Sequence, residues 1–193
     1  MTKWLSHRMV ERGIIKEEEQ ELYQFGIRNG MILLLNVVTA LVIGLLTEQL
    51  AVVAVFTLSF MVLRSYTGGY HSDSRVFCYL GSNLVLLVPV YTQAVFYKTS
   101  LARLLAVLLV SAGIIFLLSP MHSKNRKLDK EEQKHFGRKA RLIAALELAV
   151  LGILWHAGQI PYAYAVYTGI CITALFMLVG KAQLWIQSHT ENG

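Results

Sequence analysis

Residues 29–47 read NGMILLLNVVTALVIGLLT, an uncharged and mostly apolar run that Glu48 ends. A helix rises ~1.5 Å per residue, so about 20 apolar residues cross the ~30 Å hydrocarbon core of a bilayer. Further apolar runs predict spans at residues 49–67, 76–97, 101–119, 142–159 and 161–180, three of which contain one charged residue each, Arg64, Arg103 and Glu147. We therefore expect an all-α, polytopic membrane helix bundle of about six transmembrane helices.

The composition is also that of a membrane protein. Hydrophobic residues make up 55% of the 193 residues and charged residues 16%, whereas a soluble domain has about 25% charged residues. The charges cluster in a few blocks between long uncharged runs. The first 26 residues lack the apolar core of a cleavable signal peptide, so we expect the first span to act as an uncleaved signal.

The basic residues predict the orientation of the bundle. With six spans and a cytoplasmic N-terminus, all but two of the 18 Lys and Arg residues, Lys98 and Arg103, fall on the cytoplasmic side. Because cytoplasmic loops are enriched in Lys and Arg, both termini are predicted to be cytoplasmic. Loops and anionic headgroups then explain the basic excess, and we expect no nucleic acid as a partner.

Three segments complete the predicted organisation around a single transmembrane domain at residues 27–181. Residues 1–26 combine apolar and charged residues at roughly helical spacing. This pattern indicates an amphipathic cytoplasmic segment on the inner membrane face, or a cap packed over the bundle. Residues 120–141 form a basic cytoplasmic loop, and residues 182–193 form a C-terminal tail.

The segment with candidate chemistry is residues 64–78, RSYTGGYHSDSRVFC. A cysteine thiol, with a pKa near ~8.5, needs a base to form thiolate, and a histidine, with a pKa near ~6.5, can take that proton. In a continuous helix His71 and Cys78 would be ~10.5 Å apart along the axis, too far for a ~3 Å contact. A catalytic pair therefore requires a bend, for which Gly68-Gly69 is suitable, and a helix that starts near Cys78.

Other interpretations of this segment stay open. Asp73 could orient the imidazole of His71 or cap the next helix. Arg64 and Arg75 could hold the acidic part of a substrate or anchor helix ends at the headgroups. Cys78 could be a small buried residue with no chemical role. A metal held by His71, Asp73 and Cys78 would lack a fourth ligand, so we expect neither a metal nor a cofactor.

Three residues inside the predicted spans depart from the apolar pattern. An intramembrane carboxylate such as Glu147 is a candidate functional group, and a paired interfacial residue is the alternative. Pro89 predicts a kink in the third span. Cys171 is expected to be a packing residue, since a cysteine in an apolar helix behaves as a small hydrophobic side chain.

The stretch Arg64…Gly68-Gly69-Tyr70-His71…Cys78 resembles the active-site region of the accessory gene regulator protein B (AgrB) family. Members of that family are bacterial membrane endopeptidases that process quorum-sensing propeptides. The similarity continues at residues 17–26, EEEQELYQFG, and at residues 119–128, SPMHSKNRKL, and so covers most of the chain in order. The resemblance implies that His71 and Cys78 are the catalytic histidine and cysteine.

The resemblance also implies a reaction and a location. Cys78 would cleave the acidic C-terminal tail from a short propeptide through an acyl-enzyme thioester, and a substrate side chain would then close a thiolactone or lactone ring. The enzyme would be a multi-pass protein of the bacterial cell membrane, in contact with the lipid bilayer, with its active site on the cytoplasmic side. The oligomeric state stays open, with a homodimer suggested by analogy. The alternatives are a membrane peptide exporter without proteolytic chemistry and a purely structural membrane partner.

Overall fold

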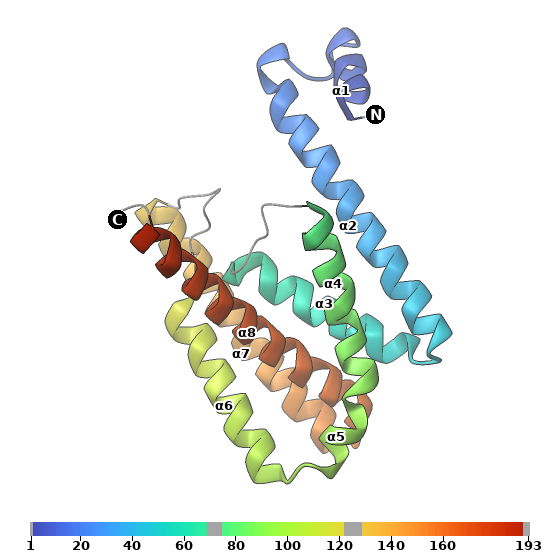
Figure 1. The fold of residues 1–193 in the computed structure, drawn as a ribbon, viewed down its shortest axis with the longest axis vertical. Helices are drawn as coiled ribbons and strands as arrows, with labels where there is room; N and C mark the ends of the chain where they lie inside the picture. Colours follow the sequence, from blue (N-terminus) through green and yellow to red (C-terminus); the bar gives the residue numbers. More distant parts are fainter. Residues whose placement is uncertain (1, 69–74, 122–128, 191–193) are drawn as a thin grey trace. The chain divides into compact units, whose positions relative to one another are not determined.

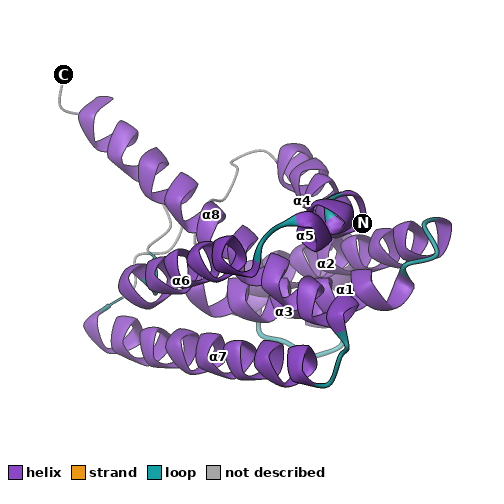
Figure 2. Cartoon of the chain, turned by 90° about the horizontal axis from the view of Figure 1, so that it is seen from below, coloured by secondary structure: helices purple, strands orange, loops and turns teal. Residues whose placement is uncertain are grey.

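The computed structural model describes residues 2–68, 75–121 and 129–190. Within these ranges the chain is helical and contains no strand, which confirms the predicted all-α class. Short loops join most of the helices in these ranges (Figure 2). In chain order the helices are α1 (Thr2–Glu11), the 3-10 helix η1 (Glu17–Glu19), α2 (Gln20–Leu46), α3 (Leu50–Thr67), α4 (Arg75–Tyr91), α5 (Gln93–Lys98), α6 (Leu101–Leu118), α7 (Lys130–His156) and α8 (Ile160–Thr190).

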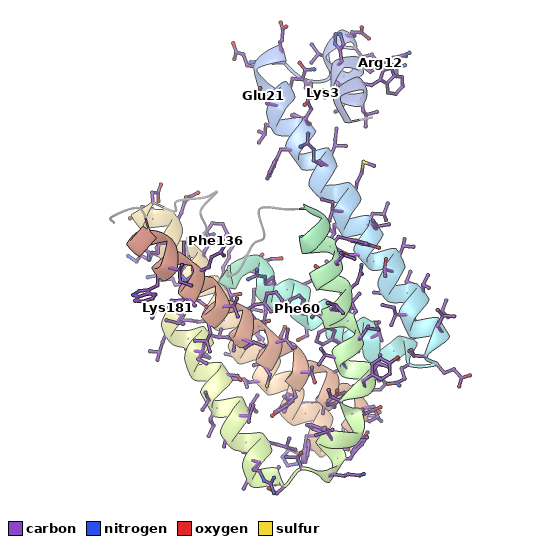
Figure 3. All side chains as sticks on the ribbon, viewed as in Figure 1. Lys3, Arg12, Glu21, Phe60, Phe136 and Lys181 are labelled. Atoms are coloured by element: carbon purple, nitrogen blue, oxygen red, sulfur yellow. The ribbon has the colours of Figure 1, made fainter. Side chains whose placement is uncertain are left out.

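The chain forms two compact units, residues 1–39 and residues 40–193. The first contains α1, η1 and most of α2. Within it, Gln20 Nε2 donates to Ser6 Oγ over 3.4 Å, and the Arg8 guanidinium lies 4.9 Å from the centre of the Trp4 ring. The predicted boundary at residues 26 and 27 falls inside α2 and stays a prediction. Figure 3 labels three charged side chains of this unit, Lys3, Arg12 and Glu21.

Four helices of the described ranges are long and apolar enough to cross a membrane. They cover residues 17–46, 50–67, 101–118 and 160–186, at the positions of four predicted spans. The third predicted span is divided at Thr92 between α4 and the short α5. The fifth forms the C-terminal half of α7, whose N-terminal half is charged. Length and composition thus identify four of the six predicted spans.

Helix α8 is the central element of the second unit. It packs against α3, α6 and α7, and in Figure 1 it runs between α6 and α3. Buried side chains of α3, α6 and α8 form a shared core, which includes Leu63, Ile115 and Ile170. The approach of α8 to α3 depends on Gly169, where a Cβ atom would lie only 2.4 Å from Ser59 Oγ. The bundle around the predicted site is therefore organised by α8.

The carboxylate of Glu147 has a hydrogen-bond partner within the bundle. Ser59 Oγ on α3 donates to Glu147 Oε2 on α7 over 2.7 Å. Ser59 is buried and Glu147 is half-buried. This contact gives Glu147 a partner between two helices of the bundle, and both interpretations offered for Glu147 stay predictions.

Candidate active site

The structure describes part of the predicted catalytic segment. His71 and Asp73 lie outside the described residues, and so do the side chains of Arg75 and Cys78. The backbone of Arg75 and Cys78 belongs to the first turn of α4. The first N–H groups of an α-helix have no partner within the helix and favour negative charge. Helix α4 thus starts near Cys78, as predicted, and the role of Cys78 as a thiolate nucleophile stays a prediction.

Arg64, the first residue of the predicted catalytic segment, lies in the last turn of α3. Its Nη1 atom donates to the carbonyl oxygen of Gly68, and its guanidinium carbon lies 5.4 Å from the centre of the Phe176 ring on α8. A cation at a helix C-terminus interacts favourably with the helix dipole. Arg64 therefore contributes to holding the end of α3 where the catalytic segment begins.

Gly68 is held in close backbone contact with Met121. The amide of Met121 donates to the Thr67 carbonyl oxygen over 2.8 Å. Gly68 has φ of 72°, a value that favours glycine. A Cβ atom at this position would also lie 2.6 Å from the Met121 carbonyl oxygen. This arrangement, called here the Gly68–Met121 contact, requires glycine for two independent reasons.

The start of α7 packs beside the same point. A Cβ atom on Gly137 would lie 3.0 Å from Pro120 Cδ, so this helix comes close to the chain just after α6. The ring of Tyr66 on α3 lies 6.3 Å from that of Phe136, which Figure 3 labels on α7. Lys139 Nζ lies 5.9 Å from the centre of the Tyr66 ring. The ends of α3 and α6 and the start of α7 therefore meet beside Gly68, within the predicted catalytic segment.

The described charges near this meeting point are mainly basic. Arg141 Nε donates to the Phe116 carbonyl oxygen at the end of α6 over 3.1 Å. The neighbouring turns of α7 expose three more cations, Lys134, Arg138 and Lys139. The described part of the chain holds no group of three His, Cys, Asp or Glu side chains that could bind a metal. The alternative metal site at His71, Asp73 and Cys78 lies outside that part.

Comparison with known proteins identifies the family. The family model described as Accessory gene regulator B matches residues 1–178. The chain belongs to the AgrB family. One relative, Accessory gene regulator protein B of Staphylococcus intermedius, is 26% identical over 156 residues, which are 79% of this chain and 80% of the relative.

Two AgrB-like proteins of Clostridium perfringens are also similar to this chain. The protein of strain SM101 is 23% identical over 148 residues, 74% of this chain and 69% of its own length. The second protein, of strain 13, is 25% identical over 134 residues, 65% of this chain and 61% of its own length. No solved structure matches the chain significantly. The resemblance inferred from the sequence motifs is confirmed, and it assigns this AgrB family member to accessory gene regulation.

AgrB membership and the helices agree on the class of protein. Several helices are apolar and long enough to cross a bilayer, which indicates a membrane protein. The contacts around the start of the catalytic segment were not foreseen from the sequence. Met121 lies in one of the stretches that resemble AgrB, but no spacing rule pairs it with Thr67, which is far earlier in the chain. Tyr66 and Gly137 carry no sequence signal for their contacts.

Proposed function

We propose that this AgrB family member is a membrane-embedded cysteine endopeptidase that removes the C-terminal part of a quorum-sensing propeptide. The observation that carries the proposal is the position of Cys78 in the first turn of α4. Helix α4 directly follows the stretch of chain that contains His71, and that stretch starts after the Gly68–Met121 contact. A helix start favours the thiolate form of a cysteine, and a nearby histidine supplies the base.

In the proposed reaction, His71 takes the proton of the Cys78 thiol, and the thiolate attacks a peptide carbonyl carbon. The C–N bond then breaks, and His71 returns the proton to the departing amine. The acidic C-terminal fragment leaves with a new amino group, while the N-terminal part remains on Cys78 as a thioester. Free N–H groups in the first turn of α4 are suitable donors for the oxyanion that develops.

A side chain of the bound propeptide completes the reaction. The thiol of a cysteine, or the hydroxyl of a serine, attacks the thioester carbonyl, and its proton passes through His71 to the departing sulfur of Cys78. The product is a thiolactone or lactone peptide, and the step needs no cofactor because one acyl bond replaces another. Water competes for the same thioester, and a site beside the bilayer limits its access.

The Gly68–Met121 contact supports this proposal on geometric grounds. A misplacement of ~1 Å in an active site can reduce the rate by ~10²-fold, so the segment between Gly68 and Cys78 needs a defined starting point. Arg64 contributes to that point through the Gly68 carbonyl. We assign two supporting roles in the same proposal, Asp73 as the group that orients His71 and Arg75 as a contact for the acidic part of the substrate.

The setting of the enzyme belongs to the same proposal. The protein would be a multi-pass protein of the bacterial cell membrane, with the active site on the cytoplasmic side. Its partners would be the lipid bilayer, a short propeptide with an acidic C-terminal tail and a second copy of the chain in a homodimer. The exposed basic side chains at the start of α7 agree with a cytoplasmic location of that end.

The test is to co-express the protein with the short propeptide encoded next to its gene and to analyse both by mass spectrometry. The wild type should release the C-terminal fragment and carry an acyl adduct on Cys78. Cys78→Ala and His71→Ala should insert normally and do neither. Cys171→Ala is the matched control, because it removes the cysteine of α8 and should cleave normally.

Two outcomes would contradict the proposal. Cleavage that survives in Cys78→Ala would remove Cys78 as the nucleophile. Transport of the propeptide across the membrane without cleavage, in the wild type and in Cys78→Ala alike, would favour the peptide exporter.

A further inference from the structure

Helix α4 carries Cys78 in its first turn, so whatever orients α4 also positions the Cys78 backbone. The buried side chains described on α4 are Val85, Leu86 and Pro89, all in its C-terminal half. The described side chains before them, at residues 79–84, are half-buried or exposed. Among the described residues, the tightest packing of α4 therefore lies away from Cys78.

At this C-terminal end the chain bends at Thr92, between α4 and α5. Pro89 has no N–H and cannot donate to the Val85 carbonyl, which weakens the helix just before the bend. Thr92 Oγ1 donates to the Val88 carbonyl oxygen over 2.8 Å and lies 2.6 Å from Tyr164 Oη on α8. Tyr164 Oη also lies 3.4 Å from the Val88 carbonyl oxygen, so one hydroxyl of the pair donates to that carbonyl and the other donates to its partner hydroxyl.

Phe96 holds the chain on the other side of the bend. Its ring centre lies 4.9 Å from that of Tyr164, 5.3 Å from that of Tyr167 and 6.3 Å from that of Trp155 on α7. Phe96 is buried, and Tyr164 is 2% exposed. Tyr164 therefore contacts both sides of the bend, Thr92 through its hydroxyl and Phe96 through its ring.

A small change at this bend has a large effect at Cys78. Roughly 14 residues separate Cys78 from Thr92, which is ~21 Å along a helix. A rotation of about 5° at Thr92 would move the first turn of α4 by ~2 Å over that length. The contact between nucleophile and base requires ~3 Å, and ~1 Å of misplacement can reduce the rate by ~10²-fold.

We propose that Tyr164 and Thr92 are positioning residues for the Cys78 reaction, because their hydrogen bond sets the bend through which α4 places Cys78 beside its base. This inference rests on the proposed endopeptidase function. It assigns a role in catalysis to a residue pair at the opposite end of α4 from the nucleophile.

The test uses the purified full-length protein in lipid nanodiscs, with the synthetic propeptide encoded next to its gene as substrate. Tyr164→Phe removes the hydroxyl and keeps the ring against Phe96. We expect kcat to fall by at least ~10-fold while KM stays within about twofold of the wild type. Alkylation of Cys78 by a maleimide, measured in a Cys171→Ala background, should also slow, because a maleimide reacts with the thiolate and its formation depends on the base.

Changes at the partner residue and elsewhere on α8 separate positioning from general packing. Thr92→Val should lower kcat as Tyr164→Phe does, whereas Thr92→Ser keeps a hydroxyl and should restore most of it. The double variant with Tyr164→Phe and Thr92→Val should be no slower than the slower single variant. The reason is that the two substitutions remove the same hydrogen bond, between Thr92 and Tyr164. Tyr162→Phe removes a hydroxyl two residues earlier on α8 and should leave kcat unchanged.

The inference fails if folded Tyr164→Phe cleaves at the wild-type rate. It also fails if kcat falls and KM rises only in proportion to a loss of folded protein. If Tyr164→Phe does not fold, Thr92→Val and Thr92→Ser decide, and equal kcat values would overturn the inference. Cleavage that depends on Cys78 but not on Tyr164 would remove this inference and leave the proposed function intact. A wild type that does not cleave would overturn both.

Discussion

Helices α3 and α4 contain the two ends of the predicted catalytic segment, but their buried side chains are distributed differently. The buried side chains of α3 recur along its whole length, from Val52 through Phe56, Ser59 and Leu63 to Thr67. The described buried side chains of α4 lie only in its C-terminal half. Helix α3 therefore provides a fixed platform that ends at Gly68, whereas α4, called here the arm, has its described buried side chains near Thr92.

This difference indicates how the two candidate catalytic groups are placed. The segment that contains His71 leaves the fixed platform at the Gly68–Met121 contact, while the backbone of Cys78 depends on the arm. Small displacements of the platform and of the arm add up at the proposed contact between the nucleophile and its base. Changes in either helix should therefore affect cleavage, and changes in the α3 core should also affect stability.

The largest expected effect comes from breaking the end of the platform with Gly68→Ala. The added Cβ atom would lie 2.6 Å from the Met121 carbonyl oxygen, at a φ that side chains rarely adopt. Because the backbone must move, propeptide cleavage should fall by about 100-fold or more. Cleavage assays on equal amounts of membrane-inserted protein measure this loss. Gly152→Ala is the control, since a Cβ atom there meets nothing within 4 Å; equal activity of the two variants would contradict the prediction.

A second variant, Gly169→Ala, should loosen the platform along its length. Its Cβ atom would lie 2.4 Å from Ser59 Oγ and 3.1 Å from Ser59 Cβ, at the closest approach of α8 to α3. Overpacking of this kind costs about 1–3 kcal/mol of unfolding free energy, measurable by SDS titration in mixed micelles with circular dichroism. Gly113→Ala on α6, where the added atom is in open space, should change stability little. A Gly169→Ala variant as stable as the wild type would show that α3 and α8 are not closely packed.

A smaller effect is expected from Ser59→Ala, which removes the donor to Glu147. Interhelical hydrogen bonds in membrane proteins contribute about 0.6 kcal/mol on average, so the unfolding free energy should fall by roughly that amount. The coupling between Ser59→Ala and Glu147→Gln in a double-mutant cycle isolates this hydrogen bond. Additive effects would show that α3 and α7 are not joined there. Ser65→Ala, on the exposed face of α3, is the matched control.

The smallest effect is predicted for Lys139→Ala beside Tyr66. A cation–π contact at an exposed position contributes about 0.5 kcal/mol, so stability should change by no more than that. The same unfolding titration checks this change, with Lys134→Ala on α7 as the control. A buried contact contributes on the order of 1 kcal/mol. If Lys139→Ala lowers the unfolding free energy by about that much more than Lys134→Ala does, the start of α7 is part of the platform.

Much of the fold could be predicted because the pattern of apolar residues records the membrane environment directly. The apolar runs at 29–47, 49–67, 101–119 and 161–180 became helices of matching position. The split of the third span at Thr92 was only partly foreseen. Pro89 indicated a kink, but the bend lies at Thr92, where Tyr164 from a distant helix holds it.

The candidate site was predictable in its chemistry and not in its surroundings. The types and order of Gly68, His71 and Cys78 indicated a cysteine–histidine pair with a bend, and α4 does begin just before Cys78. The partners Met121 and Phe176 left no trace in local sequence, because both come from other parts of the chain. Whether His71 and Cys78 form a catalytic pair stays a prediction.

The sequence by itself determined the helical class, the family and the residue types for the proposed chemistry, since hydropathy and motif spacing are local properties. Only the tertiary structure decided that Ser59 bonds to Glu147, that Tyr164 bonds to Thr92 and that Gly68 meets Met121. Each of these contacts depends on how helices pack in three dimensions. Packing depends on close fit between distant residues, such as the space that Gly169 leaves for Ser59, and a linear pattern does not contain that information.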